Sequence, residues 1–369
     1  MSIARLFSRI CGCDAARHIR REFSGIPSIS AIFALIFVAV WFTGCTPRVQ
    51  SVGPSVLIPE VSDQVIVVSD GHRLPVRVWR ATGKETHVIV ALHGFNDYSN
   101  AFSMPAEWWA GRGVTTYAYD QRGFGETTDR GIWPGTQNLV SDLFDVIRAV
   151  RARHGETSIF IAGSSMGGAV ILAAYGSSLN SPGVSDVPAM ERIKHAPPQI
   201  SGVILAAPAV WGRATMSPIY RAVLWLMVHV APRVHVSGKD LRITPSDNIE
   251  MLRALSRDPL VIKETRTDAV YGLVNLMDVA LKAAGHLSIP ALVLYGEKDE
   301  IIPRGATGLM IDRLDSRHRI ALYPDGYHML FRDHQAEVVW RDVLTWIEDI
   351  DAPLPSGRTF EQNRLSAGN

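Results

Sequence analysis

Cysteine is scarce in this chain of 369 residues, and the three cysteines lie at positions 11, 13 and 45. No disulfide framework is therefore possible beyond residue 45. Cys11 and Cys13 have no second Cys or His cluster nearby that would complete a metal site, so we assign them no metal. The sequence shows no nucleotide-binding loop either, and it predicts no cofactor.

The sequence also lacks an excess of charge of one sign. It has 37 lysines and arginines against 36 aspartates and glutamates, a formal net charge of +1. A nucleic-acid partner would require a basic balance, so no such partner is predicted. Hydrophobic residues make up 47% of the chain and charged residues 20%, which excludes a disordered protein.

A long apolar run occurs near the start, where residues 31–42 (AIFALIFVAVWF) follow a basic stretch. These 12 residues are too few for a bilayer-spanning helix, which needs about 20, but they suit the apolar part of a signal peptide. Phe42-Thr43-Gly44-Cys45 follows and resembles the bacterial lipobox, in which the cysteine is lipidated. The sequence predicts a lipoprotein-type leader over residues 1–44, lipidated at Cys45, on a periplasm-facing protein of the bacterial envelope. An uncleaved membrane anchor and a plain signal peptide remain alternatives.

From residue 87 onward, short apolar runs alternate with stretches of helical periodicity. The strand-like runs are residues 88–92, 114–119, 158–162, 202–206, 291–295 and 319–323, and helical spacing covers residues 137–154 and 335–350. Such alternation is typical of βαβ units. The sequence predicts an α/β architecture, with a mostly parallel central sheet flanked by helices. A hairpin over residues 65–68 and 74–79 is expected to precede it.

The alternation breaks between residues 209 and 286, where helical patterns are punctuated by prolines. This break predicts an inserted helical cap. We therefore expect a tether at 45–61, core segments at 62–208 and 287–351 on either side of a cap at 209–286, and a polar tail at 352–369.

The run at residues 158–162 leads directly into a G-x-S-x-G pattern and then into an alanine-rich stretch. A serine between strand and helix is typical of a nucleophile on a sharp turn. Gly163 and Gly167 are needed because a side chain two residues either side of the serine would collide with the strand or helix. Ser165 occupies the apex and is the predicted nucleophile.

A serine nucleophile requires a base and a group that orients the base. In this arrangement the acid and then the histidine come later in the chain, each just beyond a strand. Asp299 follows the run at 291–295, and His328 follows the run at 319–323. The sequence predicts Ser165, Asp299 and His328 as the catalytic residues.

Attack on a carbonyl also requires hydrogen-bond donors for the oxyanion. One donor is expected from the residue after the nucleophile and the other from the loop after an early strand. These are the backbone N–H groups of Met166 and Phe95. His93 lies near this loop but precedes the acid in sequence, so we expect a structural role for it.

These motifs together resemble the α/β-hydrolases, and within them the monoacylglycerol lipase and lysophospholipase-like group of serine aminopeptidase S33 type. The resemblance spans residues 62–350 or so and also includes the DQRGFG loop at residues 120–125. It implies a carboxylic ester hydrolase that forms an acyl-enzyme. Phe95 departs from the smaller residue frequent in relatives, and a ring there would narrow the acyl slot.

The apolar segment at residues 218–230 indicates a helix that is either buried in the cap or in contact with lipid. Together with a lipid anchor, it favours a lipid ester, a monoacylglycerol or lysophospholipid, as substrate. Thioester or amide hydrolysis and acyl transfer remain alternatives on the same three residues, because the triad does not choose the acceptor. A non-catalytic envelope protein that binds lipid is the alternative from another class.

Overall fold

The computed structural model describes residues 46–176, 196–238 and 243–359. The predicted leader, with Cys45, lies outside the described residues, as does the end of the predicted polar tail. Within the described ranges, no helix combines the length and the apolar character needed to cross a bilayer.

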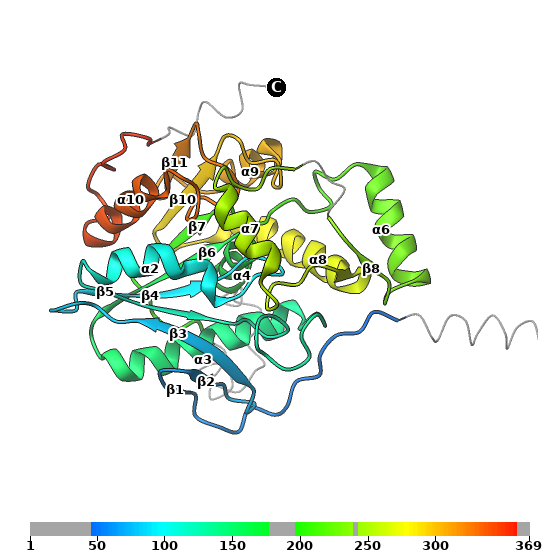
Figure 1. Cartoon of the computed structure of the whole chain (residues 1–369), viewed down its shortest axis with the longest axis horizontal. Coiled ribbons are helices and arrows are strands. Elements are labelled where there is room, and N and C mark those ends of the chain that lie inside the picture. The colour runs from blue at the N-terminus through cyan, green and yellow to red at the C-terminus, as the bar shows by residue number, and fades with distance from the viewer. Residues whose placement is uncertain (1–45, 177–195, 239–242, 360–369) are drawn as a thin grey trace, which may run out of the picture. The chain divides into compact units, whose positions relative to one another are not determined.

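A nine-stranded sheet forms the centre of the described chain (Figure 1). Its strands are β1 (Glu60–Val61), β2 (Val65–Val67), β3 (Arg73–Trp79), β4 (His87–Leu92), β5 (Val114–Tyr119), β6 (Ser158–Ser164), β7 (Gly202–Ala206), β10 (Ala291–Gly296) and β11 (Arg319–Tyr323). They lie in the order β1-β2-β3-β5-β4-β6-β7-β10-β11. The first four strands in this order pair antiparallel, and the pairs from β5 to β11 are parallel. The predicted hairpin and the mostly parallel sheet are both confirmed.

The central strands are apolar along their whole length because helices cover both faces of the sheet. In β4, Val88, Val90 and Leu92 pack into one core cluster, while Ile89 and Ala91 pack into the other. Successive side chains of a strand point to opposite faces, so one strand contributes to both clusters. This is why the sequence shows unbroken runs here rather than alternation.

Two helical layers cover the sheet. The described helices are α2 (Ser103–Ala110), α3 (Thr136–His154), α4 (Met166–Tyr175), α6 (Pro218–Val230), α7 (Ile249–Arg257), α8 (Thr267–Ala283), α9 (Arg304–Ile311) and α10 (Ala336–Glu348), with short 3-10 turns η2 (Ser99–Phe102) and η3 (Ala284–His286). Residues of α3, α4 and α8 belong to one core cluster, and residues of α2 and α10 belong to the other. This three-layer arrangement is the predicted α/β class.

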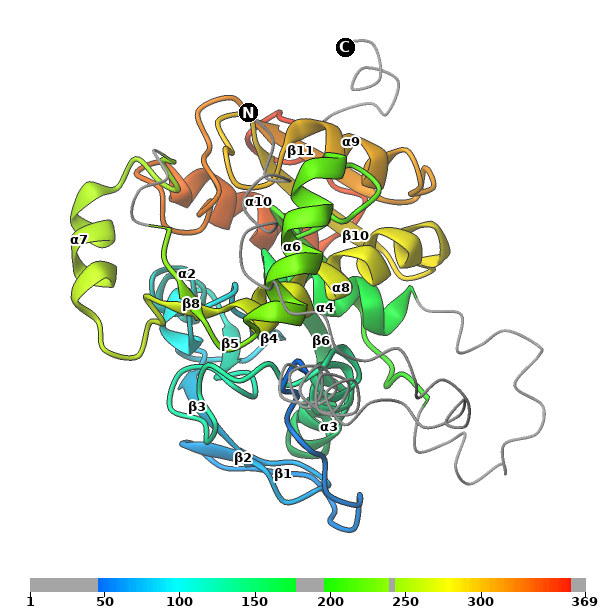
Figure 2. The same cartoon turned by 90° about the vertical axis from the view of Figure 1, so that its right-hand side faces the viewer.

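The chain between β7 and β10 is mainly helical and contains α6, α7 and α8 (Figure 2). It also holds a small antiparallel pair, β8 (His235–Val236) with β9 (Thr265–Arg266), which the sequence analysis did not predict. Two-residue strands are too short to leave a periodic signal. The segment predicted as a cap falls within this part of the chain.

The first residues of the predicted polar tail are packed against the core. Leu354 is buried, and the backbone N–H of Ser356 donates to Asp342 Oδ1 at 3.0 Å. The N–H of Leu322 in β11 donates to the carbonyl of Arg358 at 3.2 Å. This part of the tail therefore contacts α10 and then runs along the edge strand β11.

Candidate active site

Ser165 stands at the sharp turn between β6 and α4. Its backbone has φ 51° and ψ −113°, a strained conformation for a residue with a side chain. The turn is held by its N–H, which donates to the Ala206 carbonyl at 2.9 Å, and by its carbonyl, which accepts from Ala209 N–H at 2.9 Å. Hydrogen bonds to β7 and the loop after it therefore fix the serine at the carboxyl edge of the sheet.

The two glycines that flank the serine leave no room for a side chain. A Cβ on Gly163 would lie 2.5 Å from the backbone of Gly167 and Gly168, and a Cβ on Gly167 would lie 2.2 Å from the Leu92 carbonyl oxygen. Neither contact is tolerable, because the neighbouring atoms are backbone. The steric reason that the sequence analysis gave for the G-x-S-x-G pattern is thus present in the structure.

Asp299 and His328, which are 29 residues apart, come together at the ends of β10 and β11. His328 Nδ1 lies 2.8 Å from Asp299 Oδ2. Asp299 Oδ1 also accepts from the N–H groups of Ile301 at 2.8 Å and Ile302 at 3.0 Å. Because the carboxylate can only accept, the proton of neutral His328 resides on Nδ1, and Nε2 is left with its lone pair.

Both side chains of this pair are shielded, with 0% of the Asp299 side chain and 7% of the His328 side chain exposed. Among the described residues, no hydrogen bond joins the Ser165 hydroxyl to His328. Such contacts are often long in a ligand-free enzyme and tighten when substrate binds. The structure thus brings Asp299 and His328 into direct contact and places Ser165 at the strained turn.

The loop after β4 lies directly against the serine. A Cβ on Gly94 would be 3.4 Å from the Ser165 Cβ. In the described part of the chain, neither the N–H of Phe95 nor that of Met166 donates to another residue. The two amides predicted as oxyanion donors are therefore free to bind a ligand. The Phe95 ring packs edge-on against Phe124, with ring centroids 5.7 Å apart.

His93 is fully buried and makes structural contacts. Its Nδ1 donates to the Gly94 carbonyl at 2.7 Å, and its Nε2 accepts from the Gln121 N–H at 2.9 Å. Burial lowers the pKa of His93. The hydrogen bond to the Gly94 carbonyl acts in the opposite direction but is the smaller effect. The neutral ring thus joins the loop after β4 to the loop after β5, in agreement with the structural role expected for it.

The loop after Phe95 is tied to the chain between β7 and β10. Asn96 has φ 65°, and its side-chain amide donates to Thr265 Oγ1 at 2.6 Å. Its carbonyl accepts from the Ile262 N–H at 2.9 Å. These contacts leave no signal in the sequence, because the partners lie more than 160 residues away and their residue types form no pattern.

The histidine loop has its own support. Asp333 Oδ2 accepts from the N–H of Tyr327 at 2.8 Å, directly before His328. Arg332 forms an ion pair with Asp97, so that the loop after β11 is also joined to the loop after β4. The sequence gives no sign of this role for Asp333, Arg332 or Asp97, because isolated charged residues near a histidine are common in solvent-exposed loops.

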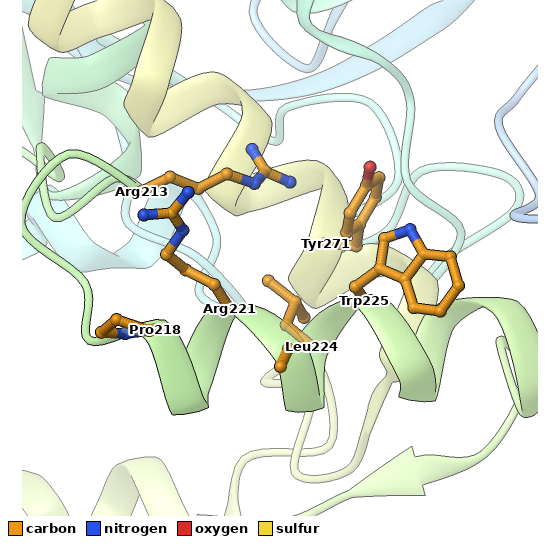
Figure 3. Close-up of a pocket in the computed structure, with 7 residues that line it drawn as sticks. Arg213, Pro218, Arg221, Leu224, Trp225 and Tyr271 are labelled. Atoms are coloured by element: carbon orange, nitrogen blue, oxygen red, sulfur yellow. The ribbon is translucent and has the colours of Figure 1, made fainter.

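A cavity of about 430 Å³ lies between α6 and α8 (Figure 3). Arg213 enters it from the chain that follows β7 and lies over the Tyr271 ring, with 5.0 Å from the guanidinium carbon to the ring centroid. Its guanidinium is paired with Asp278 and donates to Asn275 Oδ1 at 2.9 Å. Arg221 and Trp225 line the same cavity from α6. The cavity thus has an apolar wall with two guanidinium groups.

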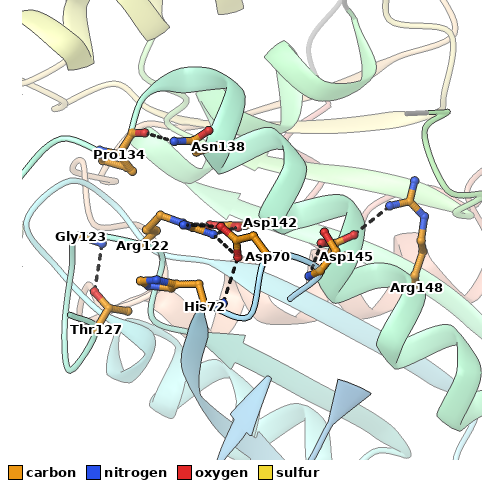
Figure 4. Close-up of polar contacts among 11 residues, drawn as sticks. Asp70, His72, Arg122, Gly123, Thr127, Pro134, Asn138, Asp142, Asp145 and Arg148 are labelled. Atoms are coloured by element: carbon orange, nitrogen blue, oxygen red, sulfur yellow. Dashed lines mark hydrogen bonds and ion pairs between the residues drawn. The ribbon is translucent and has the colours of Figure 1, made fainter. Parts of the chain in front are cut away.

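A buried charge network supports the loop after β5 (Figure 4). Arg122 donates from Nε and Nη2 to the two oxygens of Asp142 at 2.9 and 2.7 Å, and its Nη1 lies 2.8 Å from Asp70 Oδ2. Burial raises the pKa of Asp142 to about 6, against the hydrogen bonds from Arg122. Burial also raises the pKa of Asp70, but hydrogen bonds from Arg122 and the His72 N–H outweigh it and lower that pKa overall. Arg122 belongs to the DQRGFG loop that the sequence points to, but nothing in the sequence identifies Asp70 and Asp142 as its partners.

Comparisons with known proteins show which family and fold this chain resembles. Residues 83–335 match the model of a hydrolase family described as serine aminopeptidase, S33. A monoacylglycerol lipase of Mycolicibacterium smegmatis is 26% identical over 280 residues, which cover 75% of this chain and 93% of the relative. Phospholipase YtpA of Bacillus subtilis is 23% identical over 267 residues, covering 71% and 95%. The structure of a Saccharomyces cerevisiae monoglyceride lipase superposes with a TM-score of 0.60 at 18% identity, covering 85% of this chain and 98% of that one.

Proposed function

The chain belongs to the serine aminopeptidase S33 family of α/β-hydrolases and is a carboxylic ester hydrolase, and we propose that it cleaves lipid esters, monoacylglycerols or lysophospholipids, with Ser165 as nucleophile. The observations that carry this proposal are the 2.8 Å contact of His328 Nδ1 with Asp299 Oδ2 and the strained strand-to-helix turn on which Ser165 stands. Such a contact orients a histidine to act as a base.

In the proposed mechanism, His328 Nε2 takes the proton of the Ser165 hydroxyl as the oxygen attacks the ester carbonyl. The N–H groups of Phe95 and Met166 bind the oxyanion of the tetrahedral intermediate. Collapse of this intermediate breaks the ester bond, and the imidazolium returns its proton to the leaving alcohol. Water then cleaves the acyl-enzyme by the same proton route, and the free acid leaves. Asp299 keeps the imidazole in the required tautomer throughout.

The lipid character of the substrate is supported by two observations. The relatives in M. smegmatis and B. subtilis are named as a monoacylglycerol lipase and a phospholipase. The proposed cap, residues 209–286, carries the apolar helix α6. A series of glycerol esters tests this, since the rate must rise from short to medium or long acyl chains. A rate that falls as the chain lengthens contradicts a lipid ester as substrate.

Labelling with a fluorophosphonate probe tests the nucleophile directly. The full-length protein is expected to form one adduct on Ser165, and Ser165→Ala is expected to form none and to lose ester hydrolysis. Ser164→Ala is the matched control, because this neighbour lies in β6 rather than at the apex of the turn. An unlabelled but folded wild-type protein would instead support a lipid-binding protein without catalysis.

For the N-terminus we propose a lipoprotein-type leader over residues 1–44 that is cleaved before Cys45, so that a lipidated Cys45 is the first residue of the mature protein in the bacterial envelope. The support is the sequence of residues 31–45, which combines an apolar run with a lipobox-like ending. Incorporation of an alkyne-bearing fatty acid tests it. Cys45→Ala is expected to abolish incorporation, whereas Cys11→Ala and Cys13→Ala are expected to retain it. Labelling that persists in Cys45→Ala contradicts the proposal.

A further inference from the structure

His328 is held by backbone hydrogen bonds on both of its sides. The N–H of Tyr327, directly before it, donates to Asp333 Oδ2 at 2.8 Å. The N–H of Met329, directly after it, donates to the Pro245 carbonyl at 3.0 Å. The direction of a side chain depends on the backbone around its Cα, so these two acceptors govern where the imidazole of His328 points.

Asp333 does not turn freely, because each of its carboxylate oxygens has a partner. Oδ2 accepts from Tyr327, and Oδ1 accepts from the Ser246 hydroxyl at 2.6 Å. Ser246 Oγ in turn accepts from the N–H of Asn248 at 3.2 Å. The exposed fractions of Asp333 and Ser246 are 2% and 0%, and buried hydrogen bonds are electrostatically stronger than those in water. A buried hydrogen-bond chain therefore runs from Ser246 through Asp333 to the backbone beside His328.

The segment that contributes this serine contacts both loops of the proposed catalytic pair. It comprises residues 244–248, which directly precede α7 in the chain between β7 and β10. The N–H of Thr244 donates to Glu300 Oε2 at 2.7 Å, one residue beyond the acid. Asp247 Oδ1 accepts from the N–H of His334 at 2.9 Å, beyond the catalytic histidine. Residues 244–248 thus join the loop after β10 to the loop after β11.

Another buried carboxylate in this fold provides a reference for Asp333. Asp342 on α10 is fully buried, and its Oδ2 accepts from the Tyr323 hydroxyl at 2.7 Å. Its Oδ1 accepts from the N–H of Ser356 in the C-terminal tail at 3.0 Å. Like Asp333, it thus accepts from a hydroxyl and from a backbone N–H, but neither donor is adjacent to His328. Removal of Asp342 therefore has a comparable cost for folding without touching the histidine loop.

We propose that Asp333, held by Ser246, is a positioning residue that aims the imidazole of His328 at the nucleophile. Proton transfer requires His328 Nε2 and the Ser165 oxygen to approach within about 3 Å, and a misplacement of about 1 Å lowers a rate on the order of 100-fold. Asp333 acts through the N–H of Tyr327 rather than on a reacting atom. This role rests on the proposed function, in which His328 is the base.

Steady-state hydrolysis of a water-soluble nitrophenyl ester by the full-length protein tests this role, with active sites counted by fluorophosphonate labelling to completion. Asp333→Ala is expected to lower kcat per labelled site about 30-fold, with little change in KM, because the N–H of Tyr327 loses its acceptor. Asp333→Asn is expected to stay within about threefold of the wild type. Its amide oxygen still accepts from Tyr327, and its amide nitrogen still bonds to Ser246.

Two further variants separate positioning from folding. Asp342→Ala is expected to lower the free energy of unfolding but to leave kcat per labelled site unchanged. Ser246→Ala is expected to lower kcat about fivefold, because Asp333 then loses one of its two hydrogen bonds. The double variant with Asp333→Ala is expected to be no slower than Asp333→Ala alone, since Ser246 acts through Asp333. Losses that multiply contradict this route. If Asp333→Ala does not fold, Ser246→Ala decides, and an unchanged kcat contradicts the role.

Three results for the single variants overturn the positioning role. One is a wild-type kcat per labelled site in Asp333→Ala, since the carboxylate then serves folding alone. Another is an equal loss in Asp342→Ala, since general destabilisation then explains both. The third is a loss in Asp333→Asn as large as in Asp333→Ala, since the charge rather than the hydrogen bonds then acts on His328. A wild-type protein that neither labels nor hydrolyses the ester refutes the proposed function, and with it the role of Asp333.

Discussion

The side chain of Asn96 is hydrogen-bonded to Thr265 Oγ1 at 2.6 Å, so the residue next to a proposed oxyanion donor is fastened to β9. The Phe95 N–H belongs to the peptide group between Gly94 and Phe95. It can stabilise an oxyanion only if this peptide group and the next one, between Phe95 and Asn96, keep their orientation. Asn96 already has a left-handed backbone, with φ 65°. We therefore regard Asn96 as a positioning residue that links β9 to the proposed oxyanion hole.

Asn96→Gly is expected to lower kcat about fivefold with little change in KM, because glycine keeps the left-handed backbone but loses a hydrogen bond of about 1 kcal/mol. Steady-state hydrolysis of a soluble ester measures both constants. Thr265→Val is expected to give the same loss, and Thr265→Ser is expected to restore the rate. If the fold-decrease in kcat of the double variant equals the product of the two single decreases, Asn96 and Thr265 act independently, and the proposed link between them is refuted.

Asp299→Asn is expected to lower kcat about 10⁴-fold, because the amide presents an N–H to His328 and favours the wrong tautomer. The Asn oxygen still accepts from Ile301 and Ile302, so the loop is expected to keep its fold. Asp325→Asn is the control, since this carboxylate pairs with Lys298 on the surface. Stopped-flow or steady-state rates with a nitrophenyl ester measure the loss, and a drop below tenfold contradicts the role given to Asp299.

Arg122→Met is expected to lower the free energy of unfolding by about 3 kcal/mol or more, because it leaves the buried carboxylates of Asp70 and Asp142 without their cationic partner. Urea denaturation followed by circular dichroism measures the change. Arg341→Met, which breaks an exposed pair with Glu337, is the matched control and is expected to leave the unfolding midpoint in place. Equal midpoints for both variants would show that the buried network does not stabilise the fold.

The lowered pKa of His93 predicts a pH dependence of stability. Its pKa is lower in the folded chain than the ordinary value of 6.5, chiefly through burial, so the unfolded chain binds more protons between the two values. Stability from this group is therefore present above pH 6.5 and is lost as the pH falls toward the folded pKa.

His93→Gln isolates this contribution, because Asp142, with a pKa near 6, is present in both proteins and cancels in the comparison. The variant is expected to be less stable at neutral pH but to lose less stability on acidification below pH 6.5. Denaturant titrations at a series of pH values measure the two slopes. Parallel slopes for the two proteins contradict a neutral, buried His93.

Much of the fold could be predicted because a doubly covered sheet imposes strong local patterns. The strand β6, the glycines around Ser165 and the helix α4 each leave a local signal in the sequence, namely an unbroken apolar run, a G-x-S-x-G pattern and an alanine-rich stretch. The order of Ser165, Asp299 and His328 along the chain also follows from strand order in such a sheet.

The supporting contacts could not be predicted in the same way. Asn96 and Thr265 are 169 residues apart, and Arg122 meets Asp142 through packing of a loop on α3. Sequence periodicity does not predict such pairs, because each contact depends on the position that a segment distant in the sequence takes in the folded structure. The sequence also leaves the environment of α6 open, since an apolar helix has the same pattern whether it packs on protein or contacts lipid.

The position of β10 and β11 at one side of the sheet has a consequence for biosynthesis. These strands join beyond β7, and they carry Asp299 and His328 at their ends, whereas Ser165 follows the central strand β6. A nascent chain that has already formed β4, β6 and β7 thus holds its serine without base or acid. On the proposed mechanism, the polypeptide cannot cleave esters during synthesis, and it gains reactivity only when its last two strands are added.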